Sequence, residues 1–396
     1  MGVLAHPEHH FEVVHVGGTN GKGSTATMVY EVLRAAGWRV GLYTSPHLVS
    51  FRERIAVDGV PVPEEAVAAW TERLRPLAEE RQASFFEITT AIAFADFAAR
   101  GVDVAVVEVG LGGRLDATNV LRPLACGVTR IALEHTDYLG PDLASIAREK
   151  AGIAKAGVPF VTTEPSDEVA AVLGAEARAR SALYERLDAT AAVSGLEAGP
   201  DGCSFDLGTP EHRYAGARVG MAGGYQAANA ALAVRLAELL PARYGVDEAA
   251  VRTGLAAAHV PGRFERRGRW IFDVAHNPDG ARALVGAIRS AKPPRPLAGV
   301  VAVLGDKAWR EYLATLAPSL DVLLLTRAPS APPDRGWSLD EVTGWCGEQG
   351  IAALTEPDFA RALERAPLLG RTVLVAGSFH TVGDAMARLP GTAPLG

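Results

Sequence analysis

A glycine-rich segment near the start of the chain has the residues and the setting of a phosphate-binding loop. Residues 17–25 read GGTNGKGST and lie between an expected strand and an expected helix. Glycines let backbone N–H groups face phosphate oxygens, and the N-terminus of the following helix adds positive potential. Lys22 could reach the terminal phosphates, and Ser24 or Thr25 could meet Mg²⁺. The loop is a variant, because Gly23 occupies the Ser/Thr position that follows the lysine in the standard pattern.

Two further side chains are expected at the edge of a sheet where ligands bind in α/β proteins. Glu108 stands near the end of a Val-rich run at 102–109, which predicts a buried parallel strand. A buried carboxylate is costly unless it is paired, protonated or bound to a cation. His135 follows the next expected strand, at 124–131. Oxygen and imidazole ligands beside ATP phosphates would suit Mg²⁺. Taken alone, His135 is also compatible with a hydrogen-bonded loop histidine.

The basic residues are strongly biased toward arginine. Five of the 39 basic residues are lysines, namely Lys22, Lys150, Lys155, Lys292 and Lys307. A lysine that is retained in such a chain raises the question of what arginine could not do there. Lys150 lies in a helix expected near 143–155, where its alternative role is an i,i+4 partner for a helix carboxylate.

Composition bounds the class of protein. The chain has 396 residues, 48% of them hydrophobic and 21% charged, which is typical of a soluble globular protein of two or three domains. A net charge of −7 without a basic block argues against nucleic-acid binding. Three scattered cysteines form no disulfide framework and no metal-binding pair, so we expect a reducing compartment, the cytoplasm. No apolar run is long enough to span a membrane, and the first residues do not resemble a signal peptide.

The chain alternates expected strands with expected helices. Apolar, β-branched runs predict strands at 11–16, 39–44, 102–109, 124–131 and 158–163. Helices are expected from the loop to about residue 36 and at 64–80, 86–99, 143–155 and 224–240, the last of them amphipathic. Residues 184–220 are polar and irregular and predict short strands at a sheet edge, and 259–269 reads as a linker. Strands follow at 270–275, 297–304, 321–326 and 372–377. This pattern predicts two α/β domains, 1–261 and 262–396, each a mostly parallel sheet covered by helices.

The loop GTNGKGST at 18–25 closely resembles the ATP loop of the Mur-ligase superfamily, and more narrowly that of folylpolyglutamate synthases, including the bifunctional dihydrofolate synthase form. The resemblance continues in order along the chain, in YTSPHLVSFRERI (43–55), VEVGLGGRLDATNV (107–120), HTDYLG (135–140), REKAGI (148–153), PGRFE (261–265), FDVAHNPDG (272–280) and GSFHTVG (377–383). It implies an α/β protein with an N-terminal P-loop-type ATPase domain, which also binds folate, and a smaller, Rossmann-like C-terminal glutamate-ligase domain. One departure is Glu134, which stands where this family commonly has Asp.

The resemblance also implies the reaction. An ATP-dependent ligase would phosphorylate the carboxylate of a pterin substrate, and the α-amine of L-glutamate would attack the acyl phosphate. The substrates implied are ATP, L-glutamate and a reduced folate such as tetrahydrofolate, and also dihydropteroate, which would become dihydrofolate. We expect a monomeric enzyme of folate biosynthesis and one-carbon metabolism in the cytoplasm, without nucleic-acid or membrane partners.

Residue roles are carried over from the matching motifs. Implied ATP contacts are Thr19, Asn20, Gly21, Lys22, Gly23, Ser24, Asn229, Arg263 and Asp273. Implied Mg²⁺ ligands are Ser45, Glu108 and His135. Lys150 is implied to be carbamylated by CO₂ and to bind a second Mg²⁺, which arginine cannot match because it presents no neutral amine. Implied folate contacts are Ser84, Phe86, Glu87, Leu115, Asp116 and Ala117, and implied glutamate contacts are His276 and Ser378. Lys22, Lys150 and His276 are the expected catalytic residues.

Structural alternatives exist for several of these residues. Ser45 could be a turn residue before a proline, Phe86 a core residue, and Asp116 a cap of the turn that follows it. Arg263 could form an interdomain salt bridge and Asp273 could cap a helix.

Two other functions compete with this interpretation. A peptidoglycan Mur ligase shares the loop and the mechanism but carries an additional N-terminal nucleotide-sugar domain, for which the expected position of the first strand, at 11–16, leaves no room. A P-loop nucleotide switch would bind partners rather than form bonds, and the second α/β domain, with Asp273 and His276, argues against it.

Overall fold

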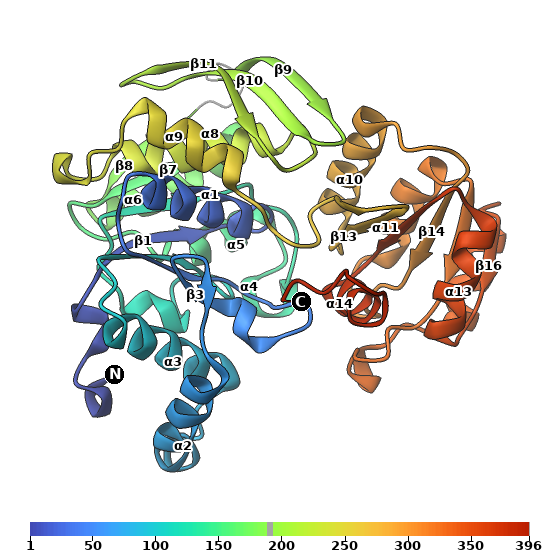
Figure 1. Ribbon diagram of the computed structural model, residues 1–396, viewed down its shortest axis with the longest axis horizontal. Coiled ribbons are helices and arrows are strands. Elements are labelled where there is room, and N and C mark those ends of the chain that lie inside the picture. Colours follow the sequence, from blue (N-terminus) through green and yellow to red (C-terminus); the bar gives the residue numbers. More distant parts are fainter. Residues whose placement is uncertain (188–192, 396) are drawn as a thin grey trace.

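A computed structural model describes residues 1–187 and 193–395 and shows two α/β units, each a sheet covered by helices, that lie side by side (Figure 1). The first sheet has eight strands in the order β4-β3-β2-β5-β1-β6-β7-β8. Their bounds are β1 (Glu12–Gly17), β2 (Val40–Tyr43), β3 (Ile55–Val57), β4 (Val60–Pro61), β5 (Val104–Glu108), β6 (Ala125–Val128), β7 (Pro159–Thr162) and β8 (Leu183–Arg186). In this spatial order, all neighbouring strands from β2 onward to β8 are parallel. The pairs β2 with β3 and β3 with β4, at the other end of the sheet, are antiparallel.

Helices cover both faces of this sheet. Their bounds are α1 (Lys22–Ala35), α2 (Glu64–Arg81), α3 (Phe85–Ala99), α4 (Thr136–Leu139), α5 (Leu143–Ala151), α6 (Asp167–Ala179), α8 (Gln226–Glu238) and α9 (Glu248–Ala257). Core residues of α1 and α8 pack on one face, whereas those of α3, α5 and α6 pack on the other. Side chains alternate between the two faces along β1, where Val14 and Val16 contact the first set and Val13 contacts α3.

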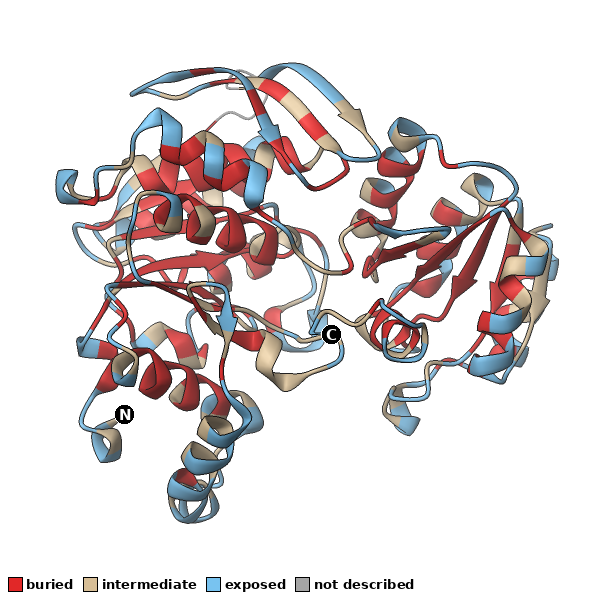
Figure 2. Ribbon diagram, viewed as in Figure 1, coloured by how far each residue is buried: buried red, intermediate tan, exposed pale blue. Residues whose placement is uncertain are grey.

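A small antiparallel sheet corrects two predictions from the sequence. Strands β9 (Val193–Gly199), β10 (Gly202–Gly208) and β11 (Arg213–Val219) form a separate three-stranded sheet. Of the strands expected at a sheet edge in the segment 184–220, only β8 lies at the edge of the large sheet. This sheet packs over α8, which is buried on almost all sides rather than amphipathic (Figure 2). The helix can be buried because small alanines surround its apolar residues, and both faces find an apolar partner.

The second sheet has six strands in the order β12-β13-β17-β14-β15-β16. Their bounds are β12 (Glu265–Arg267), β13 (Trp270–Asp273), β14 (Leu297–Val301), β15 (Val322–Leu325), β16 (Ala353–Thr355) and β17 (Thr372–Ala376). All pairs are parallel except β12 with β13, and β12 lies inside the segment predicted to be a linker. The covering helices are α10 (Pro278–Ala291), α11 (Trp309–Leu316), α12 (Leu339–Glu348), α13 (Phe359–Leu369) and α14 (Phe379–Arg388).

The predicted fold class is confirmed: a mostly parallel N-terminal sheet and a smaller Rossmann-like C-terminal sheet, each between layers of helices. The short strands β3, β4 and β16 and the helices α6 and α9 were not predicted from the sequence. Among the described residues, no helix is both long and apolar enough to cross a membrane.

Candidate active site

The glycine-rich loop connects β1 to α1, as predicted, and its conformation requires glycine at two positions. Gly18 and Gly21 have φ angles of 130° and 96°, which side chains other than glycine rarely adopt. A Cβ atom on Gly18 would lie 1.9 Å from Thr129 Oγ1, and one on Gly21 would lie 2.3 Å from Asn229 Oδ1. The loop backbone therefore passes very close to α8 and to the end of β6, as a loop that presents its N–H groups to a ligand must do.

Lys22 lies between the loop and the end of β5. Its Nζ donates a hydrogen bond to the carbonyl of Thr19 at 3.1 Å and lies 3.9 Å from Glu108 Oε1. The hydroxyl of Thr19 accepts a hydrogen bond from the backbone N–H of Ala132 at 3.1 Å, which ties the loop to the segment after β6. Glu108, which was predicted to lie at this edge of the sheet, is thus within reach of the lysine that is expected to bind phosphate.

Glu108 and Ser45 come together at the ends of β5 and β2. Glu108 is buried, and its Oε2 accepts a hydrogen bond from the backbone N–H of Ser45 at 3.0 Å. Burial raises the pKa of Glu108, although Lys22 and Arg263 oppose the shift. Both residues line a cavity of about 230 Å³ together with Gly23 and Arg263. A buried carboxylate and a hydroxyl at a cavity wall are donors that suit Mg²⁺ beside phosphate oxygens, so these residues fit the implied ion.

His135 lies at the start of α4 with a left-handed backbone, φ 52°, and its Nε2 is 3.9 Å from Glu134. Burial and the nearby ammonium groups of Lys307, Lys150 and Lys22 lower the pKa of His135 to about 4, against the opposing effect of Glu134. The ring is therefore neutral at pH 7 and keeps a lone pair that a metal ion could use.

Lys150 is buried in α5 and points at the phosphate loop. Its Nζ donates a hydrogen bond to the carbonyl of Gly18 at 2.7 Å. Burial, assisted by the charge of Lys22, lowers the pKa of Lys150 to about 7. The alternative role, a solvated partner for a helix carboxylate, is wrong, because the side chain is inside the protein and beside the loop.

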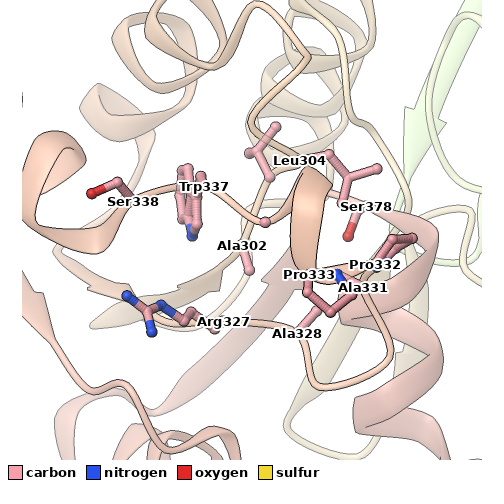
Figure 3. A pocket seen from close by; sticks show the side chains of 12 residues that line it. Ala302, Leu304, Arg327, Ala328, Ala331, Pro332, Pro333, Trp337, Ser338 and Ser378 are labelled. Carbon is pink, nitrogen blue, oxygen red and sulfur yellow. The ribbon is translucent and has the colours of Figure 1, made fainter.

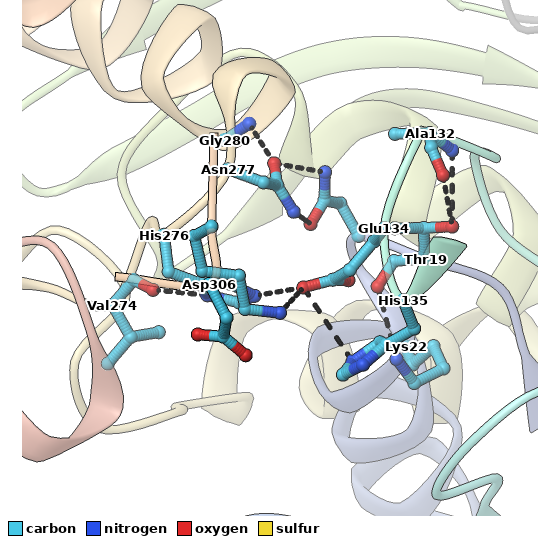
Figure 4. A network of polar contacts seen from close by, with 12 residues as sticks. Thr19, Lys22, Ala132, Glu134, His135, Val274, His276, Asn277, Gly280 and Asp306 are labelled. Atoms are coloured by element: carbon cyan, nitrogen blue, oxygen red, sulfur yellow. Dashed lines mark hydrogen bonds and ion pairs between the residues drawn. The ribbon is translucent and has the colours of Figure 1, made fainter. Parts of the chain in front are cut away.

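A carboxylate of the first domain binds two basic residues of the second (Figure 4). Glu134 Oε1 accepts hydrogen bonds from His276 Nε2 at 2.6 Å and from Lys307 Nζ at 3.1 Å. Burial opposes ionisation, but His276, Lys307 and His135 hold the pKa of Glu134 well below its usual range. His276 Nδ1 lies 2.8 Å from the carbonyl of Val274, so both ring nitrogens face oxygen atoms that can accept hydrogen bonds.

Neither Glu134 nor Lys307 was assigned to the site from the sequence. The rarity of lysine was the available signal for Lys307. For Glu134, the signal was its place beside His135, in a segment that follows a parallel strand.

A second contact joins the loop to the start of α10. Asn20 Nδ2 donates hydrogen bonds to Asp279 Oδ2 at 2.9 Å and to Asn277 Oδ1 at 3.2 Å, and Arg130 forms an ion pair with Asp279 at 2.9 Å. Asn277 also caps α10 by accepting a hydrogen bond from the N–H of Gly280 at 2.8 Å. The phosphate loop and the second domain are therefore in direct contact.

Predicted ATP contacts from four separate segments meet in one cavity of about 440 Å³ between the domains. Its lining includes Asn20, Gly21, Ser24, Asn229, Arg263 and Asp273. Thr19, Lys22 and Gly23 belong to the same loop but do not line this cavity. The cavity thus draws on the loop, on α8 and on the segments that flank β12 and β13.

Arg263 and Asp273 do not take their alternative roles. Within residues 1–187 and 193–395, Arg263 forms no ion pair; its guanidinium lies 5.6 Å from the ring centroid of Phe379, and its Nε is buried without a hydrogen-bond partner. Asp273 accepts hydrogen bonds from the N–H groups of Phe264 and Ala275, whereas Asn277 is the residue that caps α10. Burial raises the pKa of Asp273, with Arg263 among the groups that oppose it. An arginine with an unsatisfied buried donor at a cavity wall suits an anionic ligand.

The residues implied for folate lie at the start of α3 and in the loop after β5. Ser84 and Glu87 form a capping box, with Ser84 Oγ donating to Glu87 Oε2 at 2.7 Å. Phe86 is stacked on Tyr43 with ring centroids 6.0 Å apart, and its ring touches the backbone of Gly110. Phe86 is half-buried. It therefore contributes to the core, as its alternative role supposed, and part of its side chain also remains exposed.

The loop after β5 places apolar and acidic residues side by side. Leu115 is 79% exposed, and Ala117 begins a short 3-10 helix, η4 (Ala117–Val120). Asp116 caps that helix, as its alternative role supposed, and its Oδ2 also accepts a hydrogen bond from the N–H of Leu111 at 2.8 Å. A carboxylate held by several donors is fixed in direction, which is also what recognition of a flat heterocycle needs.

A buried polar chain that the sequence did not reveal leads to Asp116. Thr118 donates its only hydroxyl proton to Asp116 Oδ1, so His15 Nε2, 2.8 Å away, must donate to Thr118 Oγ1. Burial lowers the pKa of His15 to about 3, so the ring is neutral, and its Nδ1 has no hydrogen-bond partner. His15 in β1 therefore holds Asp116 through Thr118.

Ser378 and His276, the residues implied for glutamate, line two different cavities. Ser378 caps α14 through the N–H of Thr381 at 3.0 Å and lines a cavity of about 440 Å³ with Arg327 and Trp337 (Figure 3). His276 lines the cavity between the domains instead. The ring of Phe379, with its centroid 5.8 Å from that of His276, lies next to Ser378 in the chain and connects the two regions.

Comparisons with known proteins agree along nearly the whole chain. Two family models match, the Mur ligase middle domain over residues 16–237 and the Mur ligase, glutamate ligase domain over residues 262–379. The dihydrofolate synthase/folylpolyglutamate synthase of Bacillus subtilis is 36% identical over 406 residues, which cover 98% of this chain and 93% of that protein. The structure of Mycobacterium tuberculosis folylpolyglutamate synthase complexed with ADP matches with a TM-score of 0.89 at 36% identity, over 98% of this chain and 92% of that one. E. coli FolC in complex with DHPP and ADP matches with a TM-score of 0.83 at 34% identity, over 97% and 91% of the two chains.

Replacing the hydroxyl in the polar chain should destabilise the protein. In Thr118→Val, the buried N–H of His15 loses its acceptor, and Asp116 Oδ1 loses one of its two donors but keeps the backbone N–H of residue 118. We expect this to cost about 1–3 kcal/mol in the free energy of unfolding. The control is Thr71→Val, because the Thr71 hydroxyl bonds only to the carbonyl of Val67 in its own helix, and we expect a change within about 0.5 kcal/mol. Urea denaturation measures both values. Equal stability of the two variants would contradict the role given to Thr118.

Proposed function

This chain belongs to the Mur ligase family and, within it, to the folylpolyglutamate synthases, and we propose that it joins L-glutamate to a folate carboxylate at the expense of ATP. The observation that carries the proposal is the cavity between the domains, where Asn20 and Ser24 of the phosphate loop face Arg263 and Asp273 of the second domain. The reaction class, an ATP-dependent acid–amino-acid ligation, follows from the family. Its relatives include a protein named for both dihydrofolate synthase and folylpolyglutamate synthase activity.

We assign the nucleotide to this cavity. The backbone of residues 18–23 and the ammonium of Lys22 would bind the phosphates, with Arg263 adding a cation from the opposite wall. Asn229 would contact the nucleotide from α8, and Asp273 would bind the ribose hydroxyls. Because such donors are fixed before the reaction, they neutralise the charge that phosphoryl transfer develops without having to reorganise.

The reaction has two steps in this proposal. A carboxylate oxygen of the pterin substrate attacks the γ-phosphorus, ADP leaves, and an acyl phosphate forms. The neutral α-amine of L-glutamate then attacks the acyl carbon, the C–O bond to phosphate breaks, and inorganic phosphate leaves with that oxygen, while the nitrogen releases one proton to phosphate or water as the amide forms. His276 and Ser378 are the residues proposed for glutamate, and contact between the two domains would exclude water from the acyl phosphate.

The folate is assigned to the start of α3 and the loop after β5. The residues proposed to bind it are Ser84, Phe86, Glu87, Leu115, Asp116 and Ala117. Aromatic and apolar side chains would cover the flat ring, and the fixed carboxylate of Asp116 would accept hydrogen bonds from its N–H edge. Dihydropteroate is proposed as a second substrate beside tetrahydrofolate, since the pterin end is common to both.

Mg²⁺ is the proposed metal, with Ser45, Glu108 and His135 as protein ligands of one ion and a carbamylated Lys150 as a ligand of a second. When bound, the ions would neutralise the phosphate charge. Glu108 brings a buried carboxylate to the loop, His135 a neutral imidazole, and Lys150 an amine whose pKa of about 7 leaves a large neutral fraction for reaction with CO₂. We also propose the division into domains 1–261 and 262–396 and a monomeric enzyme.

The proposal is tested by following ATP turnover with dihydropteroate or tetrahydrofolate, each with and without L-glutamate. We expect sustained turnover only when both the pterin substrate and glutamate are present. Lys22→Ala should lower kcat by a factor of about 10² or more with little change in Tm, because the lost group binds charge that develops in the reaction. Lys292→Ala, which alters an exposed lysine after α10, is the control and should keep the wild-type rate. Slow hydrolysis that neither substrate stimulates would favour a nucleotide switch, and a folded Lys22→Ala variant with normal turnover would contradict the assignment of the loop.

Carbamylation of Lys150 is tested separately. We expect Lys150→Ala and Lys150→Arg to be inactive, with acetate partly rescuing the alanine variant, whereas Lys155→Arg at the neighbouring lysine keeps its activity. Because only the neutral amine reacts, carbamate formation should rise as the pH passes through the folded-state pKa of about 7. NMR with ¹³C-bicarbonate should show a carbamate signal that Lys150→Arg lacks. Wild-type activity in Lys150→Arg, or no such signal in the active enzyme, would rule the carbamate out.

A further inference from the structure

Three potential metal ligands lie together before β1, away from the site described above. They surround the 3-10 helix η2 (Pro7–His9) and comprise His6, Glu8 and His9. Within residues 1–187 and 193–395, this is the one group of three or more His, Cys, Asp or Glu side chains whose candidate ligand atoms all lie within 4.8 Å of one another. His6 Nδ1 is 2.9 Å from Glu8 Oε1, and the rings of His6 and His9 are stacked with centroids 5.2 Å apart.

The carboxylate at the centre of this group is incompletely satisfied. Glu8 is 9% exposed, and its Oε2 is buried without any hydrogen-bond partner among the described residues. A buried carboxylate oxygen without a donor is costly, and a cation is one of the few groups that would remove that cost. His6 and His9, in contrast, are exposed, so the anion is fixed below two rings that reach solvent.

We propose that His6, Glu8 and His9 bind a Zn²⁺ ion. Two imidazoles and one carboxylate form a ligand set that Zn²⁺ accepts, whereas Mg²⁺ and Ca²⁺ prefer oxygen ligands alone. Ligands about 2.1 Å from a tetrahedral ion lie about 3.4 Å from each other. His6 Nδ1 and Glu8 Oε1 are already closer than this, at 2.9 Å, and all the candidate ligand atoms lie within 4.8 Å of one another, so rotation of the two exposed rings is enough to close the site around Glu8. Water takes the fourth position, on the solvent side.

The ion would have a structural role. β1 begins at Glu12, three residues after His9, and Phe11 between them packs edge-on against Phe94 and Phe97 of α3. A metal bound at η2 would therefore hold the chain where it enters the strand that carries the phosphate loop. None of its ligands lines the cavity between the domains, so the site is separate from the ligase chemistry.

The test is calorimetric titration of the full chain with Zn²⁺ after removal of metal by EDTA and dialysis, in buffer with excess Mg²⁺ to occupy sites built of oxygen ligands. We expect the wild type to bind one equivalent of Zn²⁺. His6→Ala, His9→Ala and Glu8→Gln should each bind at least tenfold more weakly. His10→Ala, which removes an exposed neighbouring histidine outside the group, should bind as the wild type does.

Thermal unfolding supplies the second readout. Zn²⁺ should raise the Tm of the wild type and of His10→Ala but not that of His6→Ala or His9→Ala, because an ion that binds only the folded state stabilises it. Both histidines are exposed, so these variants fold even if Glu8→Gln does not. Equal Zn²⁺ affinity in the wild type and His6→Ala would overturn the proposal. So would a His6→Ala variant that is less stable than the wild type while neither responds to Zn²⁺, since this is the behaviour of a plain His6–Glu8 ion pair.

Discussion

The site depends on one carboxylate, largely but not fully buried, that attracts basic groups from the other domain. Glu134 follows a strand of the first sheet, whereas His276 and Lys307, which donate to it at 2.6 and 3.1 Å, belong to the second. The phosphate loop and Asn229 are on one side of the interdomain cavity, and Arg263 and Asp273 come from the segments that begin the other side. Both halves therefore contribute to the cavity that we propose as the nucleotide site. The contacts of Glu134, together with those of Asn20 with Asn277 and Asp279, hold the halves at a distance where one ligand can touch both.

Charge explains the remaining features of the site. Lys22, Lys150, Lys307 and Arg263 gather around two buried carboxylates, so the region attracts further negative charge, which ATP phosphates would supply. Burial is the main cause of the lowered pKa values of Lys150 and His135, and the neighbouring ammonium groups lower both values further, because each ionised group makes the next proton harder to hold. A lysine near neutrality and an uncharged imidazole are therefore consequences of the fold, not isolated properties of two residues.

Much of the fold and of the candidate site was predictable from the sequence. The features that were missed share a physical cause, since each depends on contacts between distant segments. The loop and the central strands were found because their signals are local: glycine spacing in one case and runs of β-branched residues in the other. The burial of α8 was missed because it depends on the sheet of β9–β11, which the sequence does not place. Glu134 with Lys307, and His15 with Thr118, are pairs more than a hundred residues apart, and nothing in either member's own segment indicates its partner. The roles of Asp116 and Phe86 stayed open for a related reason, since each residue both supports the fold and faces the proposed folate site.

In the reaction that we propose, the pterin carboxylate is activated as an acyl phosphate. Dihydropteroate labelled with ¹⁸O in its carboxylate tests this step directly, with mass spectrometry of the inorganic phosphate released during turnover with ATP and L-glutamate. Phosphorylation places the carboxylate oxygen between carbon and phosphorus, and attack by the amine breaks the bond to carbon. The account therefore predicts that each phosphate released carries one ¹⁸O atom. Dihydrofolate formed with unlabelled phosphate would contradict it.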